Sequence, residues 1–214
     1  LSESPLPDPP AELVQSALAD AIRQEGTRLL PMDRDGERLL ERLRFLRASL
    51  GDPWPDLSEA ALLERLDEWV LAFHPDARRL SDLRPDRLRQ GLLSLLPGPL
   101  ARQVDTLAPS HYGAPTGSRL PLRYEPEQVV LAVRVQELFG MTRHPAIAAD
   151  RVPLTLELLS PAHRPIQITQ DLPGFWAGSW RDVRADLRGR YPKHVWPEDP
   201  ALAPPTARAK PRGK

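Results

Sequence analysis

The stretch Ser110-His-Tyr-Gly-Ala-Pro-Thr-Gly-Ser-Arg-Leu-Pro-Leu-Arg-Tyr124 marks the point at which the pattern of apolar residues changes. From Leu120 to Tyr124, every second residue is apolar. Alternation with a period of two is typical of a β-strand with one buried face. Pro121 has no backbone N–H to donate to a neighbouring strand, so we expect this strand to lie at the edge of a sheet.

Residues 126–139 fit two patterns, because their apolar positions match both the period of a strand and the spacing of a helix. Pro126 at the start and Gly140 at the end favour a helix. Further on, Leu154–Leu158 and Ile166–Ile168 both alternate, and we predict a β-hairpin with a longer loop between them. A final helix is predicted from about Leu172 to Arg188.

Before residue 110 the apolar residues recur at helical spacing, with proline, glycine or a capping side chain at the ends of each run. Asp8 is a candidate N-cap for the first helix, and Gly26 ends it. Ser58 is a candidate N-cap for the third helix. The helices are predicted over about residues 9–25, 35–50, 58–73, 85–96 and 99–107.

These patterns predict an α+β fold in two parts. An N-terminal all-helical unit is followed by a small mixed domain, in the order strand, helix, hairpin, helix, and by a disordered, basic, Pro-rich tail. The predicted boundaries are a linker at 1–8, the helical unit at 9–108, the mixed domain at 109–197 and the tail at 198–214. The high proline content, 26 of 214 residues, fits the short connections.

The composition excludes several kinds of site. The chain has no Cys, so a disulfide, a thiolate nucleophile and a zinc–sulfur centre are impossible. The five His residues lie at least 19 positions apart, so no paired-His metal motif exists. The only Lys that follows a Gly is Lys214, at the end of the chain, so the phosphate-binding loop of nucleotide triphosphatases is missing. We therefore assign no catalytic or metal-binding residue and expect no cofactor in this chain.

Charge is unevenly distributed along this neutral chain. Residues 1–116 carry a net charge of −5 and residues 117–214 a net charge of +5. A basic C-terminal part is compatible with nucleic acid or with an acidic partner surface. The longest apolar run, Val129–Val133, is far shorter than the roughly 20 residues that span a membrane, so we expect a cytoplasmic protein.

The stretch from Phe175 to Trp196 holds five of the twelve aromatic residues of the chain, interleaved with basic residues. Aromatic rings can stack on bases while Arg and Lys contact phosphates. The candidate nucleic-acid-binding residues are Arg181, Arg184, Arg188, Arg190, Tyr191, Lys193, His194 and Trp196.

Packing offers an alternative explanation for part of this stretch. The apolar stripe of the last predicted helix consists of Trp176, Trp180, Val183 and Leu187. Each of three positions of this stripe is followed directly by an arginine, and these are Arg181, Arg184 and Arg188. They lie near Asp182 and Asp186 in the sequence, so a solvated face of mixed charge is an alternative to phosphate binding. Residues 190–196 lie beyond the helix among prolines, where they either bind a ligand or clamp the tail onto the domain.

Several stretches resemble HrpB-type DEAH-box ATP-dependent helicases. These are Ser110–Arg119, Val135–Gly140, Arg151–Pro165, Gln167–Trp176 and Arg188–Pro200. The last of them reads Arg-Gly-Arg-Tyr-Pro-Lys-His-Val-Trp-Pro-Glu-Asp-Pro. The resemblance covers about residues 109–200, whereas residues 1–108 fit more loosely.

The resemblance implies the C-terminal region of such a helicase. Whole members carry two RecA-like motor domains, a winged helix, a helical bundle and an OB-fold upstream, and ATP and Mg²⁺ are expected in those missing motor domains. We therefore expect an accessory region that contacts single-stranded RNA or DNA or braces the motor core of the same polypeptide. The alternative is a protein–protein docking module for that core or for an external partner. An independent enzyme is disfavoured by the missing motifs.

Overall fold

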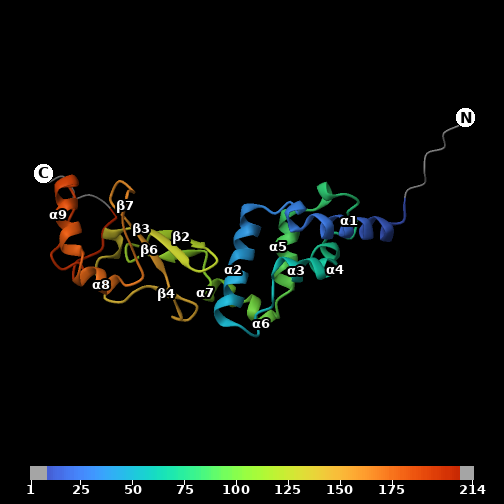
Figure 1. Ribbon diagram of the computed structural model, residues 1–214, viewed down its shortest axis with the longest axis horizontal. Helices are drawn as coiled ribbons and strands as arrows, with labels where there is room; N and C mark the ends of the chain where they lie inside the picture. Colours follow the sequence, from blue (N-terminus) through green and yellow to red (C-terminus); the bar gives the residue numbers. More distant parts are fainter. Residues whose placement is uncertain (1–8, 208–214) are drawn as a thin grey trace, which may run out of the picture. The chain divides into compact units, whose positions relative to one another are not determined.

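The computed structural model describes residues 9–207, and the predicted linker at 1–8 lies outside this range. The chain forms two compact units, one up to Val104 and one from Asp105 onward (Figure 1). The first contains helices only, and the second contains strands and helices, as expected for an α+β fold. No helix within residues 9–207 is long and apolar enough to cross a membrane.

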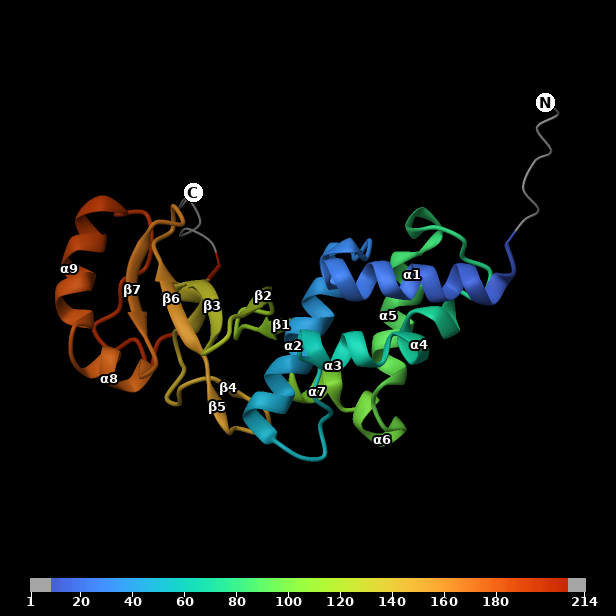
Figure 2. The same cartoon turned by 45° about the vertical axis from the view of Figure 1, so that its right-hand side comes forward.

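The helical unit is built from helices and 3-10 turns, and most of its helices are labelled in Figure 2. They are α1 (Ala11–Glu25), α2 (Arg34–Leu50), α3 (Glu59–Glu64), α4 (Leu66–Trp69), α5 (Pro85–Ser94) and α6 (Gly98–Ala101), with α7 (Val104–Leu107) at the boundary and 3-10 turns at Thr27–Leu29, Leu71–Phe73 and Leu80–Asp82. The Ser58 side chain accepts a hydrogen bond from the Ala61 N–H, which confirms the predicted cap. Asp33 caps α2 in the same way, through the Gly36 N–H.

The core of this unit depends on a close approach between α4 and α5. Trp69 is 1% exposed, and its indole N–H donates to the Leu62 carbonyl at 2.9 Å. A Cβ added to Gly91 would lie only 1.9 Å from the Trp69 carbonyl oxygen, so only glycine fits at this point of α5. The fully buried leucines of this unit include Leu43, Leu46, Leu62, Leu66, Leu88 and Leu92.

The second unit is organised around a five-stranded mixed sheet in the order β1-β2-β3-β6-β7. Its strands are β1 (His111–Gly113), β2 (Arg119–Tyr124), β3 (Val129–Arg134), β6 (Thr155–Leu159) and β7 (Pro165–Thr169). All neighbours pair antiparallel except β3 and β6, which are parallel. The β6–β7 pair is the predicted hairpin. A separate two-stranded ribbon joins β4 (Ala146–Ile147) and β5 (Val152–Pro153).

The helix predicted over residues 126–139 is wrong for most of its length. Residues 129–134 form β3, which lies between β2 and β6, and only Val135–Leu138 turn into a 3-10 helix. Val130 and Leu131 are each at most 1% exposed although they point to opposite faces. A strand buried on both faces shows no clean alternation, which is why its sequence also fits a helix.

The edge position predicted for the strand at Leu120–Tyr124 is also wrong, because β2 has a neighbour on each side. Pro121 pairs with His111 of β1, while the β3 ladder covers only Leu122–Tyr124. Proline is tolerated in β2 because its position lies beyond the end of the β3 ladder.

The single helix predicted from Leu172 to Arg188 is two helices, α8 (Leu172–Ala177) and α9 (Trp180–Arg190). The backbone breaks at Gly178, whose φ of −103° and ψ of −99° are not helical. Burial of Trp176 and Trp180 is confirmed at 9% and 1% exposure. Both rings pack with Phe139, and the Trp180 and Phe139 centroids lie 5.6 Å apart in an edge-to-face arrangement.

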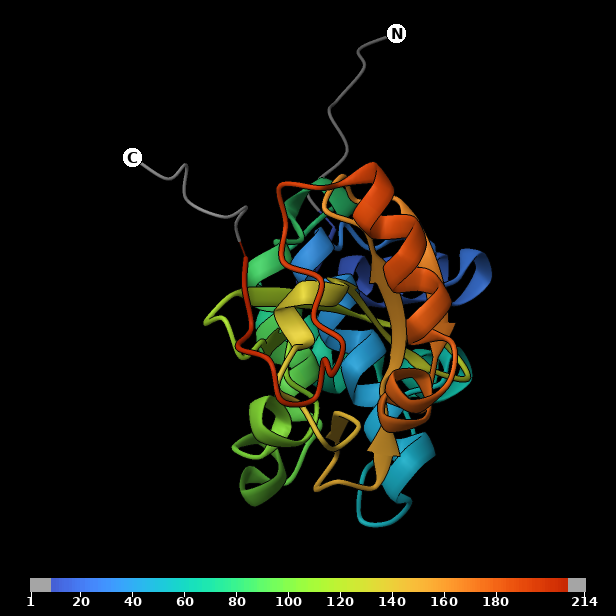
Figure 3. The same ribbon diagram turned by 90° about the vertical axis from the view of Figure 1, so that its left-hand side faces the viewer.

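Residues 191–207, here called the C-terminal strap, run back across the second unit (Figure 3). The Gly140 N–H donates to the Pro200 carbonyl at 2.9 Å, and the Thr206 N–H donates to the Gln136 carbonyl at 3.0 Å. The expectation of a disordered tail is therefore wrong for residues 198–207, because long-range hydrogen bonds hold this extended segment. Residues 208–214 lie outside the described range.

Candidate nucleic-acid interface

Helix α9 separates a buried apolar face from an exposed basic face. Trp180 and Leu187 are 1% and 2% exposed, whereas Arg181 and Arg188 lie on the surface. Arg184 lies between these two arginines on the same side of the helix, since positions i, i+3 and i+7 share a face. The predicted stripe of three arginines therefore exists.

The cations of this region differ in whether a carboxylate already neutralises them. Arg190 pairs with Asp186 one turn earlier on α9, with Nε and Oδ1 2.9 Å apart. Arg181, Arg188 and Lys193 are exposed and make no ion pair with any residue in the described range 9–207. These three side chains are available to an external anion.

The Arg184 side chain is only 21% exposed, because the strap covers it. Its Nε–H donates to the carbonyl of Trp196 at 2.9 Å. Its second contact is an ion pair with Glu198, with Nη2 and Oε1 3.3 Å apart. The strap therefore fixes the guanidinium and places one carboxylate beside it.

The aromatic residues of the strap serve packing in this structure. Trp196 is 7% exposed, and its indole N–H donates to the Tyr191 carbonyl at 2.9 Å. Tyr191 is half-buried, and its hydroxyl lies 3.2 Å from that of Ser160, the residue after β6. With these contacts the ring of Trp196 is not available to stack on a base. These contacts fit the alternative prediction, in which the residues clamp the end of the chain onto the domain.

His194 joins the strap to the 3-10 helix that follows β3. The side-chain amide of Gln136 donates to Nδ1 of His194 at 2.9 Å. Burial lowers the pKa of His194 below its ordinary value of 6.5, and the nearby positive charge of Arg134 lowers it further. His194 is therefore an uncharged anchor of the strap and contributes no positive charge to the interface near neutral pH.

The structure brings together three of the stretches that carry the helicase resemblance. Thr116 in the first donates to the Glu137 carboxylate in the second at 2.9 Å. Gln136, also in the second, bonds to His194 in the third. Gly140 then bonds to Pro200, so the second and third stretches are joined twice. Motifs that are distant in sequence form one hydrogen-bonded junction.

Glu137 is the buried charge of this junction, at 2% exposure. Burial alone would raise its pKa. Hydrogen bonds from Ser118 and Thr116 and the guanidinium of Arg134 outweigh burial, so the pKa of Glu137 lies below its ordinary value of 4.5. The Nη2 nitrogen of Arg134 lies 2.9 Å from Oε1 of Glu137. Glu137 is thus an ionised structural carboxylate that ties the loop at 116–118 to β3.

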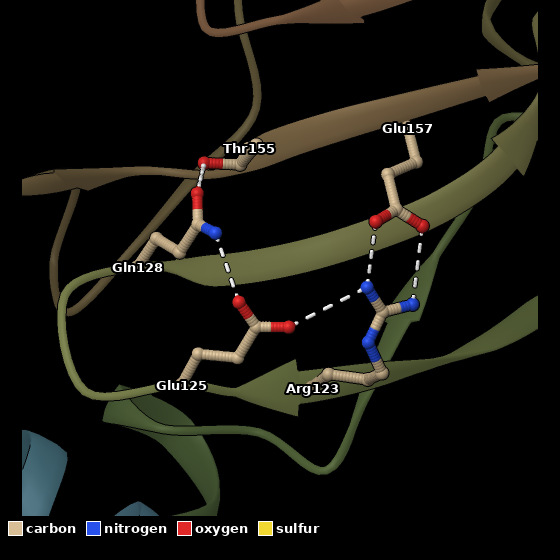
Figure 4. A network of polar contacts seen from close by, with 5 residues as sticks. All are labelled: Arg123, Glu125, Gln128, Thr155 and Glu157. Atoms are coloured by element: carbon tan, nitrogen blue, oxygen red, sulfur yellow. Dashed lines mark hydrogen bonds and ion pairs between the residues drawn. The ribbon is translucent and has the colours of Figure 1, made fainter.

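The open face of the sheet carries a different polar network (Figure 4). Arg123 on β2 reaches over β3 to Glu157 on β6 with two hydrogen bonds, of 2.7 and 3.1 Å. This hydrogen bonding holds the pKa of Arg123 above its ordinary value. Glu125 accepts from both Arg123 and Gln128, which in turn accepts from Thr155. The charges of Arg123, Glu125 and Glu157 are therefore paired with one another within this network.

Within residues 9–207, no group of His, Asp and Glu side chains is arranged to hold a metal ion.

Comparison with known proteins identifies the family to which this region is similar. The family model described as "ATP-dependent helicase C-terminal" (HrpB_C) matches residues 69–200.

This chain belongs to the HrpB C-terminal family. It is 43% identical over 210 residues to the ATP-dependent RNA helicase HrpB of Escherichia coli (strain K12), covering 96% of this chain and 26% of that protein. Two solved structures are similar. The crystal structure of the E. coli DExH-box NTPase HrpB has a TM-score of 0.88 and 41% identity, covering 96% of this chain and 26% of that one. The crystal structure of the E. coli DEAH/RHA helicase HrpB has a TM-score of 0.75 and 38% identity, covering 92% and 25%.

The chain therefore spans about a quarter of the length of the HrpB proteins that it matches. The family match begins at Trp69 in α4 of the helical unit and ends at Pro200 in the strap. The part of the chain that matches the family model thus includes both the junction around Glu137 and the basic face of α9. The resemblance read from the sequence is confirmed and extends further toward the N-terminus than residue 109.

Sequence reasoning missed two partners of the predicted site. Gln136 and Glu198 hold His194 and Arg184, yet neither lies on a periodic stripe. Their only signal was membership of the stretches that resemble the helicase family. Binding of nucleic acid by the eight predicted residues stays a prediction.

Proposed function

We propose that this chain is the C-terminal accessory region of an ATP-dependent helicase and contacts single-stranded RNA through the basic face of α9. The 43% identical relative, named ATP-dependent RNA helicase HrpB, supports a helicase acting on RNA. In this proposal the ATP- and Mg²⁺-binding motor core lies in the same polypeptide, and the protein acts in the cytoplasm. The chain would position the strand or brace the core, and would not itself turn over substrate.

The observation that carries this proposal is the set of unpaired cations at one end of the second unit. Arg181, Arg188 and Lys193 are exposed on α9 or just after it and lack carboxylate partners within residues 9–207. Because Trp196 is buried, the proposed contact is with phosphates and carries no base readout. We therefore expect binding with strong salt dependence and little sequence preference.

The test is a salt titration of binding between this chain and a short fluorescent oligouridylate, followed by anisotropy. The double variant Arg181→Gln and Arg188→Gln should bind more weakly and reduce the slope of log Kd against log salt by about 1.4, at roughly 0.7 per phosphate contact. The matched control is Arg38→Gln with Arg102→Gln, two exposed arginines of the helical unit. Equal losses in both double variants, or no binding by the unmodified chain, would overturn the proposal.

Docking onto another protein surface is a second candidate, favoured by the first turns of α1. Leu13 is 63% exposed there, and Ala17, one turn later, is exposed as well. In a longer protein that includes the motor core, Leu13→Asp should weaken the association of this region with its partner surface without altering the urea midpoint of the isolated chain. If the association is unchanged, α1 is not the docking element.

A further inference from the structure

Among the contacts within residues 9–207, Arg184 is the one arginine of the stripe Arg181, Arg184 and Arg188 whose side chain is held by hydrogen bonds. Its Nε–H donates to the Trp196 carbonyl, and Trp196 is itself buried. The guanidinium therefore keeps its place when its other contact is removed. An arginine positioned in this way loses less conformational freedom on binding an anion than its exposed neighbours, Arg181 and Arg188.

The second contact of Arg184 is with an anion that belongs to the chain itself. Glu198 lies on the strap 14 residues later, and one of its carboxylate oxygens is 3.3 Å from Nη2. This distance is longer than the roughly 2.7–2.9 Å typical of charge-assisted hydrogen bonds. The Glu198 side chain is 87% exposed, so water competes for it and the pair is weak.

The carboxylate of Glu198 occupies the position that a phosphate oxygen would take. Arginine binds carboxylate and phosphate through the same planar set of N–H donors, and phosphate can accept two parallel bonds where Glu198 accepts one. Rotation of the single exposed Glu198 side chain is enough to vacate this position. The strap need not open, because the Trp196 contact is separate.

We propose that Arg184 is a phosphate-binding position at which Glu198 acts as a competing, autoinhibitory carboxylate. This inference rests on the proposed contact between α9 and nucleic acid. A phosphate that displaces Glu198 gains a pre-oriented guanidinium between Arg181 and Arg188. The interface then consists of three arginines on one face of α9, of which the central one is occupied in the absence of ligand.

The test compares two substitutions that change the net charge equally. Glu198→Gln removes the competing charge, and Glu127→Gln removes an exposed carboxylate in the turn between β2 and β3. Binding of the fluorescent oligouridylate to the full chain is measured at low salt. We expect an about threefold lower Kd for Glu198→Gln than for Glu127→Gln, with a slope of log Kd against log salt that is steeper by about 0.7. In an Arg184→Gln background, Glu198→Gln should bring no gain.

The possible outcomes separate competition between Glu198 and phosphate at Arg184 from other effects of the substitutions. An equal gain in the two single variants would show a general charge effect and overturn the inference. A gain that persists without Arg184 would show that Glu198 acts elsewhere and would overturn it too. Binding that is absent in every variant would overturn the proposed nucleic-acid contact itself, whereas binding by the unmodified chain with no difference between variants rejects only the competition at Arg184.

Discussion

The side-chain amide of Gln136 donates a hydrogen bond to Nδ1 of His194 across 58 positions of sequence, with an N···N distance of 2.9 Å. Gln136 is 3% exposed and belongs to the 3-10 helix that follows β3, whereas His194 belongs to the strap. An imidazole that accepts at Nδ1 is neutral, so this bond exists only while His194 is uncharged. The attachment of the strap is therefore linked to pH.

His194 should make the second unit less stable in mild acid. Its pKa in the folded state is lower than 6.5, so the unfolded chain binds a proton more readily. The stabilisation is present above pH 6.5 and is lost as the pH falls through the folded-state pKa. In an NMR titration, the His194 ring should show a midpoint below 6.5. His194→Gln should show a smaller loss of unfolding free energy between neutral and acidic pH, and a midpoint at or above 6.5 would contradict this explanation.

Trp196→Ala should destabilise the second unit by about 3 kcal/mol, because it removes a buried aromatic side chain and leaves a cavity. Trp196 is 7% exposed, and its ring centroid lies 6.4 Å from that of Trp180. The matched control is Val195→Ala at a neighbouring, 38% exposed position, where we expect a change within about 0.5 kcal/mol. Urea unfolding measures both, and similar losses would show that the strap is not anchored through Trp196.

Glu137→Gln should destabilise the second unit by about 2 kcal/mol, because the half-buried partners of this buried carboxylate lose an ionised acceptor. The partners are Arg134 and the hydroxyls of Thr116 and Ser118. Since the pKa of Glu137 is lowered, its stabilisation is present above pH 4.5 and lost as the pH falls through the folded-state value. The variant should therefore lose less stability on acidification below pH 4.5. Glu127→Gln is the exposed control, and an equal pH dependence in both variants would contradict the assignment.

Gly91→Ala and Gly189→Ala should have effects of opposite sign, although both glycines lie within helices. Alanine is favoured over glycine in a helix by about 1 kcal/mol. At Gly91 the added Cβ would lie 1.9 Å from the Trp69 carbonyl, so we expect a net loss of about 2 kcal/mol. A Cβ at Gly189 of α9 meets nothing within 4 Å, so we expect a gain of up to about 1 kcal/mol. Urea unfolding of the two variants measures the difference, and a stabilising Gly91→Ala would show that α4 and α5 can move apart at little cost.

Local sequence determined the features that need only neighbouring residues. The Ser58 cap, the β6–β7 hairpin and burial of Trp176 and Trp180 follow from side-chain types at fixed short spacing, and all are present. The family resemblance also came from local stretches. Such signals are strong because a cap, a hairpin or a helical stripe is stabilised by contacts within a few residues of sequence.

Tertiary structure decided the features that depend on distant partners. Residues 129–134 became β3 because pairing with β2 and, in parallel, with β6 satisfies their backbone and buries both faces. Residues 198–207 are ordered because Gly140 and Gln136 supply hydrogen bonds from another part of the chain. Arg184 was recognisable as a basic residue, but only the fold places Trp196 and Glu198 against it. Local periodicity carries no record of such pairings, since their energy comes from groups that are brought together only when the chain folds.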